Sequence, residues 1–100
     1  MSHAPPSEAY LEDSICRRLR DIRIRKHAEH VRAGGGTWHS PYTQVALAKR
    51  LGVRYTTVWR WENDVGYNPR SLARFDRWAR LLGTSFADEL LAVIGEKIAE

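Results

Sequence analysis

The sequence predicts an all-α fold, a compact five-helix domain. Apolar residues recur at spacings of three and four, glycines and prolines separate these stretches, and no segment alternates as a strand would. The chain has 100 residues, which suits one domain with a modest core. We expect residues 1–10 to form a disordered tail and residues 11–100 to form the domain.

The first predicted helix starts at Leu11 and is long. Its early apolar face is made of Leu11, Ile15, Leu19 and Ile22. A second, offset stripe follows, made of Ile24, Ala28 and Val31. The late part of this helix is therefore predicted to run past the core. Its outer surface is basic, which is typical either of a solvated face or of a surface that contacts phosphates.

An extended loop, AGGGTWHSP at residues 33–41, is expected to separate the first helix from the second. The three consecutive glycines of Gly34–Gly36 disfavour a helix and indicate flexibility. We expect Trp38 to anchor the loop on the second apolar stripe of the first helix. The alternative is a loop tip that reaches a binding partner.

Cap residues predict where the remaining helices begin and end. The predicted limits are Thr43 to Gly52, Tyr55 to Glu62, Asn68 to Gly83, and Ser85 onward. The last helix has a wider apolar arc than one small core requires. We therefore expect part of it to pack against a partner chain, through Leu90, Leu91, Ile94 and Ile98.

The composition favours a nucleic-acid-binding protein and argues against a disulfide-bonded, secreted or membrane-spanning one. The net charge of +4 on a small domain favours a polyanionic partner such as nucleic acid. Cys16 is the only cysteine, so we expect no intramolecular disulfide and a cytoplasmic location. No apolar run approaches the ~18 residues of a membrane span, and no secretory signal is visible.

Catalytic and metal-binding patterns are also missing from the sequence. His27 and His30 lie one helical turn apart, but no third ligand is placed to complete a metal site. The glycine run lacks the Lys-Ser/Thr of a phosphate-binding P-loop, and no nucleophile–base pattern is visible. We therefore expect no enzymatic activity, no metal and no cofactor.

The segment TQVALAKRLGVRYTTVWRWEN, residues 43–63, predicts two short helices joined by a tight turn. Ala48 is small where the helices would cross, and Gly52 falls where the chain must turn. This pattern is typical of a helix-turn-helix. Together with LRDIR before it and NPRSLARFDRWARLLG after it, the segment resembles the Cro and phage-repressor family, also called the xenobiotic-response-element family. The resemblance covers roughly residues 19–23 and 42–91.

That resemblance implies a prokaryotic or phage transcriptional regulator, expected to act as a repressor. It would bind double-stranded DNA as a homodimer on a near-palindromic operator, with the second motif helix in the major groove. The implied base-contacting residues are Tyr55, Thr56, Trp59 and Arg60. The implied phosphate-contacting residues are Gln44, Arg54, Thr57, Asn63 and Asn68. The alternative is an antitoxin-type regulator that also binds a partner protein.

Three features depart from the family pattern, and one residue admits a second interpretation. The connection between the first two helices is longer than usual, Arg54 replaces a Ser or Thr cap, and Trp59 replaces a small residue. Arg60 is either a base reader or a surface arginine paired with Glu62 or Asp64. We expect Glu62 itself to bond backbone N–H groups in the following turn.

Overall fold

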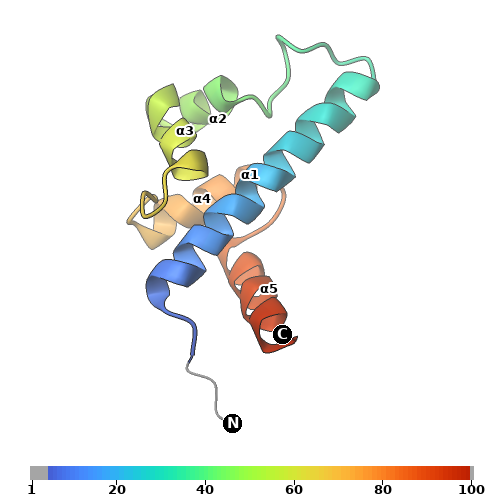
Figure 1. Ribbon diagram of the computed structural model, residues 1–100. Helices are drawn as coiled ribbons and strands as arrows, with labels where there is room; N and C mark the ends of the chain where they lie inside the picture. The colour runs from blue at the N-terminus through green and yellow to red at the C-terminus, as the bar shows by residue number, and fades with distance from the viewer. Residues whose placement is uncertain (1–4, 100) are drawn as a thin grey trace.

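The computed structural model describes residues 5–99 and contains five α-helices and no strand within them. The helices are α1 (Glu8–Arg32), α2 (Gln44–Leu51), α3 (Tyr55–Asn63), α4 (Leu72–Leu81) and α5 (Phe86–Ala99). Helix α1 crosses the molecule, with α2 and α3 on one side and α5 on the other (Figure 1). The predicted all-α class is confirmed.

Helix α1 begins earlier than the sequence analysis predicted. The Ser7 side chain accepts a hydrogen bond from the Tyr10 backbone N–H at 3.1 Å, so Ser7 is the N-cap. The expected tail therefore needs correction, because residues 8–10 are the first turn of the helix. Residues 1–4 of that tail lie outside the described part of the chain.

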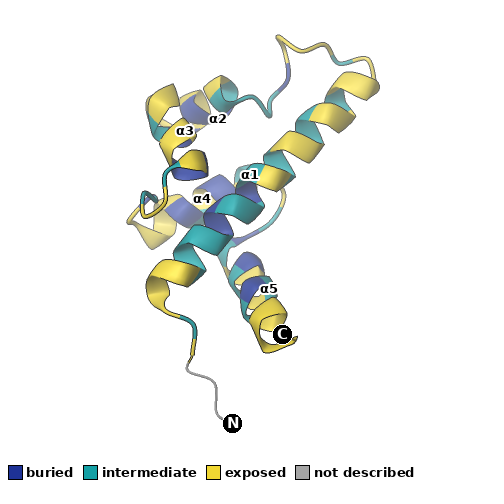
Figure 2. Ribbon diagram, in the orientation of Figure 1, coloured by how far each residue is buried: buried dark blue, intermediate teal, exposed yellow. Residues whose placement is uncertain are grey.

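The core forms where the first half of α1 meets the other helices. Trp61 of α3 packs on Trp78 of α4, with ring centroids 5.2 Å apart, and Phe75 stacks on the same indole at 6.0 Å. The buried apolar residues of the core are Ile15, Cys16, Leu19, Leu47, Ala48, Leu51, Val58, Trp61, Phe75, Trp78, Ala79, Leu82 and Val93. The second half of α1 runs beyond this core and is largely exposed, as expected (Figure 2).

Helices α2 and α3 pack on each other across the turn of residues 52–54. Gly52 takes a left-handed conformation with φ of 70°, which only glycine adopts without strain. Behind the turn, the Val53 N–H donates to the Ala48 carbonyl at 3.0 Å, and Ala48 is buried between the helices. The predictions that Ala48 lies where the two helices cross and that Gly52 makes the turn between them are confirmed.

Helix α4 starts later than predicted, at Leu72 rather than near Pro69. The Asn68 Oδ1 accepts from the Arg70 N–H at 2.9 Å, forming a local turn, and Arg70 has a φ of 59° that no right-handed helix contains. Ser71 then caps the helix by accepting from the Arg74 N–H. Asn68 is therefore a turn residue and not the expected N-cap.

Helix α5 is capped at its N-terminus, and one of its apolar faces is exposed to solvent. The Ser85 Oγ accepts from the Asp88 N–H at 3.0 Å, which confirms the predicted cap. Val93 is buried against the core, whereas Leu91 and Ile98 are exposed. No helix within residues 5–99 has both the length and the apolar character that crossing a membrane requires.

Two glycines give a paired test of this backbone. Gly52→Ala should lower the free energy of unfolding by about 1 kcal/mol, because alanine at positive φ is strained. Gly95 lies inside α5 with nothing within 4 Å of an added Cβ. Gly95→Ala should therefore raise the free energy by about 0.5–1 kcal/mol. Urea unfolding measures both, and equal effects of one sign would contradict the assigned conformations.

Candidate nucleic-acid interface

The outward face of α3 carries most of the predicted DNA-contacting residues. Val58, Trp61 and Glu62 turn inward and are buried, which fixes the rotation of the helix. The exposed positions recur at intervals of one helical turn and form a stripe of Tyr55, Thr56, Trp59, Arg60 and Asn63. All four predicted base-contacting residues therefore lie on one surface.

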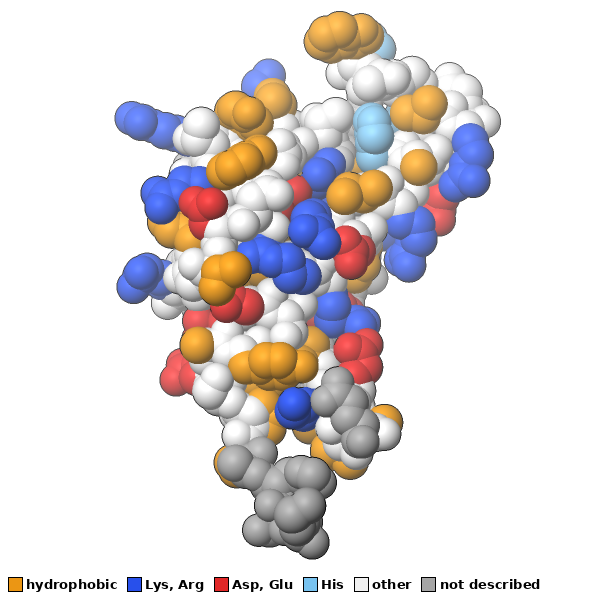
Figure 3. All heavy atoms as spheres, in the orientation of Figure 1, with side chains coloured by type: hydrophobic (Ala, Val, Ile, Leu, Met, Phe, Trp, Pro, Cys, Tyr) orange, Lys and Arg blue, Asp and Glu red, His pale blue; other side chains and the backbone are white. Residues whose placement is uncertain are grey.

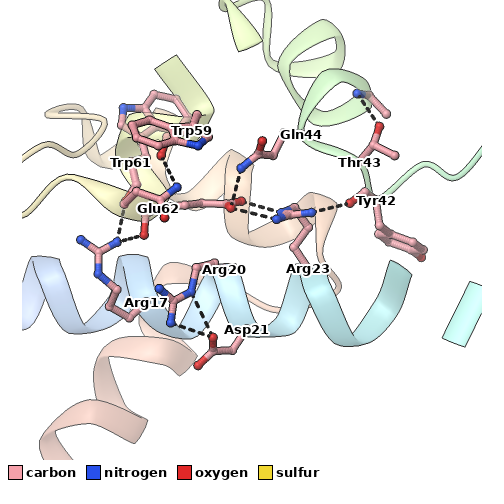
Figure 4. Close-up of polar contacts among 12 residues, drawn as sticks. Arg17, Arg20, Asp21, Arg23, Tyr42, Thr43, Gln44, Trp59, Trp61 and Glu62 are labelled. Carbon is pink, nitrogen blue, oxygen red and sulfur yellow. Dashed lines mark hydrogen bonds and ion pairs between the residues drawn. The ribbon is translucent and has the colours of Figure 1, made fainter. Parts of the chain in front are cut away.

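A buried charged cluster holds α3 in this orientation (Figure 4). The Arg23 guanidinium of α1 donates two hydrogen bonds to the Glu62 carboxylate, at 2.6 and 2.9 Å. Gln44 at the start of α2 donates a third, also at 2.9 Å. Only 1% of the Glu62 side chain and 13% of the Arg23 side chain are exposed. The expectation that Glu62 bonds backbone N–H groups is therefore wrong, because its carboxylate bonds the side chains of two other helices.

Neighbouring arginines of α1 extend this attachment. Arg17 donates to the main-chain carbonyls of Trp61, at 3.2 Å, and of Glu62. Arg23 also reaches the Tyr42 carbonyl just before α2, at 3.3 Å. Arg18 pairs with Glu89 of α5 at 2.8 Å. Much of the basic surface predicted on α1 is thus bonded within the protein, rather than available to solvent or phosphates.

A groove of about 350 Å³ lies between α1, the N-terminal end of α2 and the C-terminal half of α3. Its lining includes Ile24 of α1, Gln44 of α2, and Trp59 and Asn63 of α3. Gln44 keeps its side-chain N–H₂ on Glu62, so its position beside the groove is fixed. Basic side chains are spread over this face of the molecule between acidic and apolar ones (Figure 3).

Arg60 is held by contacts within its own neighbourhood. Its Nε donates to Asp64 one turn later at 2.9 Å, and its guanidinium lies 3.9 Å from the centre of the Tyr67 ring. The hydrogen bond to Asp64 raises the pKa of Arg60 above its usual value. The side chain is exposed and charged, so a DNA base would have to compete with Asp64 for it.

Three of the predicted phosphate-contacting residues lie in α3 or at its N-cap, whereas Asn68 lies apart from them. Arg54 stands at the N-cap of α3, where its side chain caps none of the first N–H groups of the helix. Thr57 lies half-buried in the first turn, and Asn63 donates to the Trp59 carbonyl at 2.9 Å. Asn68 lies away from α3, because its side-chain amide donates to Glu12 near the N-terminus of α1.

His27 and His30 of α1 make contacts with the loop that follows the helix, and Cys16 lies in the core. His27 Nδ1 lies 2.8 Å from Ser40 Oγ, and His30 Nε2 donates to the Gly35 carbonyl at 3.2 Å. Cys16 is fully buried, and burial raises the pKa of its thiol to about 12. Within residues 5–99, no three potential metal ligands cluster together.

Sequence reasoning missed the partners that position this surface. Arg23 belongs to the LRDIR segment, but its contact with Glu62 spans 39 positions and leaves no local signal. Tyr67 belongs to no predicted site, although its ring lies against the Arg60 guanidinium. Comparison of the chain with protein-family models, curated proteins and solved structures gives no match. A function therefore has to be inferred from the chain's own residues.

Removing Arg23 tests whether the charged cluster holds the surface. Arg23→Ala should lower the free energy of unfolding by about 3–5 kcal/mol, because the Glu62 carboxylate would stay buried without its partner. The double replacement Arg23→Met with Glu62→Met should recover much of that loss. Arg25→Ala is the matched control, since Arg25 makes only an exposed pair with Glu29 and should cost less than about 0.5 kcal/mol. Comparable losses for Arg23→Ala and Arg25→Ala in chemical unfolding would refute this role.

Proposed function

We propose that the protein is a sequence-specific double-stranded DNA-binding regulator that represses transcription as a homodimer. The observation that supports this most strongly is the exposed stripe of α3, which presents aromatic, hydroxyl and guanidinium groups on a helix fixed by Glu62. An α-helix fits the major groove of B-DNA, where base edges are distinguishable. The net charge of +4 suits a polyanionic partner.

Thr56 and Arg60 are the proposed base readers of this surface. The Thr56 hydroxyl can bond a base edge, and its methyl can contact a thymine methyl group. Arg60 can donate two hydrogen bonds to guanine O6 and N7. To do so it must leave Asp64, and a base that cannot accept both bonds would not compensate for the lost ion pair. Asp64 would in this way sharpen the preference of Arg60 for guanine.

The beginnings of α2 and α3 supply the proposed phosphate contacts. Backbone N–H groups at a helix N-terminus attract anions, and Arg54 adds a positive charge at the start of α3. Gln44 occupies the first position of α2, beside the groove that Trp59 also lines. Tyr55 and Trp59 lie on the same exposed stripe, where their rings can pack on the sugar-phosphate backbone. These contacts would set the register of α3 in the groove.

The uncovered face of α5 supports the homodimer. Of the four residues predicted to contact a partner chain, Leu90 packs against the protein's own core. Leu91, Ile94 and Ile98 are spaced three and four positions apart and therefore line one side of the helix. Leu91 and Ile98 are mainly exposed, and a second copy of the chain would bury them. Two recognition helices about 34 Å apart would then read a near-palindrome.

Binding-site selection with paired arginine variants tests the base-reading role. Arg60→Ala should lose its preference at one base pair, worth about 1–3 kcal/mol of discrimination. Arg80 is the matched control, because it makes the same one-turn pair with Asp76 on α4, away from α3. Arg80→Ala should return the wild-type consensus. An unchanged consensus for Arg60→Ala would show that Arg60 does not read a base.

Sedimentation with two leucine variants tests the dimer. Leu91→Glu should shift the protein to monomer, because a carboxylate would be buried in the interface. Leu72 is 65% exposed and Leu91 67%, so Leu72→Glu on α4 is the matched control and should leave the dimer intact. A wild-type protein that stays monomeric, even on DNA, contradicts the dimer.

A further inference from the structure

The connection between α1 and α2, residues 33–43, carries an aromatic side chain that the core does not use. The expectation that Trp38 packs on α1 is wrong, because 94% of Trp38 is exposed. The loop lies beyond α2 at the far end of α1, where apolar and histidine side chains reach the surface (Figures 1 and 3). Ile24 and Val31, its expected partners, are exposed as well.

Contacts at both ends of the loop explain why Trp38 points outward. His30 bonds Gly35 as the loop leaves α1, and a side chain at Gly35 would collide with the His30 ring at 2.2 Å. His27 bonds the buried Ser40, whose Oγ also accepts from the Tyr42 N–H at 3.1 Å. Trp38 stands between these two attachments. The loop therefore presents the indole and does not leave it on an untethered chain.

The surface around Trp38 continues into the proposed DNA interface. A second groove, of about 480 Å³, lies between the loop and the outer side of α2, lined by Trp38, Val45 and Lys49 among others. Thr43, the N-cap of α2, lines this groove and also the groove beside Trp59. One connected surface thus runs from α3, past the N-terminus of α2, to Trp38.

Charge on this surface favours a polyanion. Between positions 24 and 49 the chain has four lysines and arginines and one acidic residue. That residue, Glu29, pairs with Arg25, whereas Arg32 and Lys49 make no ion pair within the described residues. Trp38 shares its groove with Lys49, and an exposed ring beside a cation can pack on the sugars of a nucleic acid while the cation contacts a phosphate.

We propose that the loop of residues 33–43 is a second DNA contact, which binds the same duplex outside the base pairs read by α3. This inference rests on the proposed function. Trp38 would pack on the sugar edges of the flanking groove, and Arg32 and Lys49 would contact its phosphates. The long α1, about 37 Å at ~1.5 Å per residue, places the loop at the end of the molecule, where such a contact can form.

The experiment compares two duplexes that differ only in length. One is the consensus from binding-site selection alone, and the other adds about 10 bp, one helical turn, at each end. Wild-type protein should bind the longer duplex about tenfold more tightly, because only its flanks offer the sugar and phosphate contacts of the loop. Trp38→Ala should lose that gain but match wild type on the short duplex. Leu72→Ala, at an exposed position on α4, should keep the gain.

Salt titration of the same duplexes separates the charge contribution. Arg32→Ala should reduce the slope of log affinity against log salt by about one on the long duplex only. Equal wild-type affinity for both lengths, or equal losses by Trp38→Ala on both, would overturn the loop contact and leave the α3 interface standing. A wild-type protein that binds neither duplex would overturn the proposed function itself.

Discussion

The attachment of Glu62 to Arg23 is the interaction on which the rest of the proposed interface depends. Helix α3 has nine residues, too few to be stable alone in water. Val58 and Trp61 supply the apolar contact with the core, but because such contacts are non-directional they leave the helix some freedom to slide. The buried carboxylate of Glu62 removes that freedom, because it has to stay within hydrogen-bond distance of Arg23 and Gln44. Three helices therefore meet at one charged group.

The same cluster uses basic side chains that a ligand would otherwise contact. Arg17, Arg18 and Arg23 of α1 bond carbonyls or carboxylates inside the protein. Their charge holds the helices together and is largely unavailable to a ligand. The cations that make no ion pair within the described residues include Arg32, Lys49 and Arg54, which lie farther along the chain. The net charge of +4 predicted the class of partner, whereas the ion pairs indicate where on the surface that partner would bind.

Local patterns predicted much of the fold. Apolar spacing identified all five helices, and Gly52 and Ser85 marked ends that the structure confirms. The predicted start of α4 was wrong, because the Asn68 side chain accepts from the Arg70 N–H and forms a local turn before the helix. The family resemblance implied which α3 residues would share one face, and the spacing of the exposed positions along the helix agrees with it. The partners of Glu62 and the exposure of Trp38 depend on contacts between distant segments, which one sequence does not encode locally.

The central claim is that the outward face of α3 binds duplex DNA while the Glu62 cluster keeps its place. Amide chemical-shift mapping by NMR, with the selected duplex added to labelled protein, tests this most directly. The account predicts the largest shifts at Tyr55, Thr56, Trp59 and Arg60 and at the N-terminus of α2, with α4 little affected. Shifts confined to α4, or no shift at duplex excess, would contradict it.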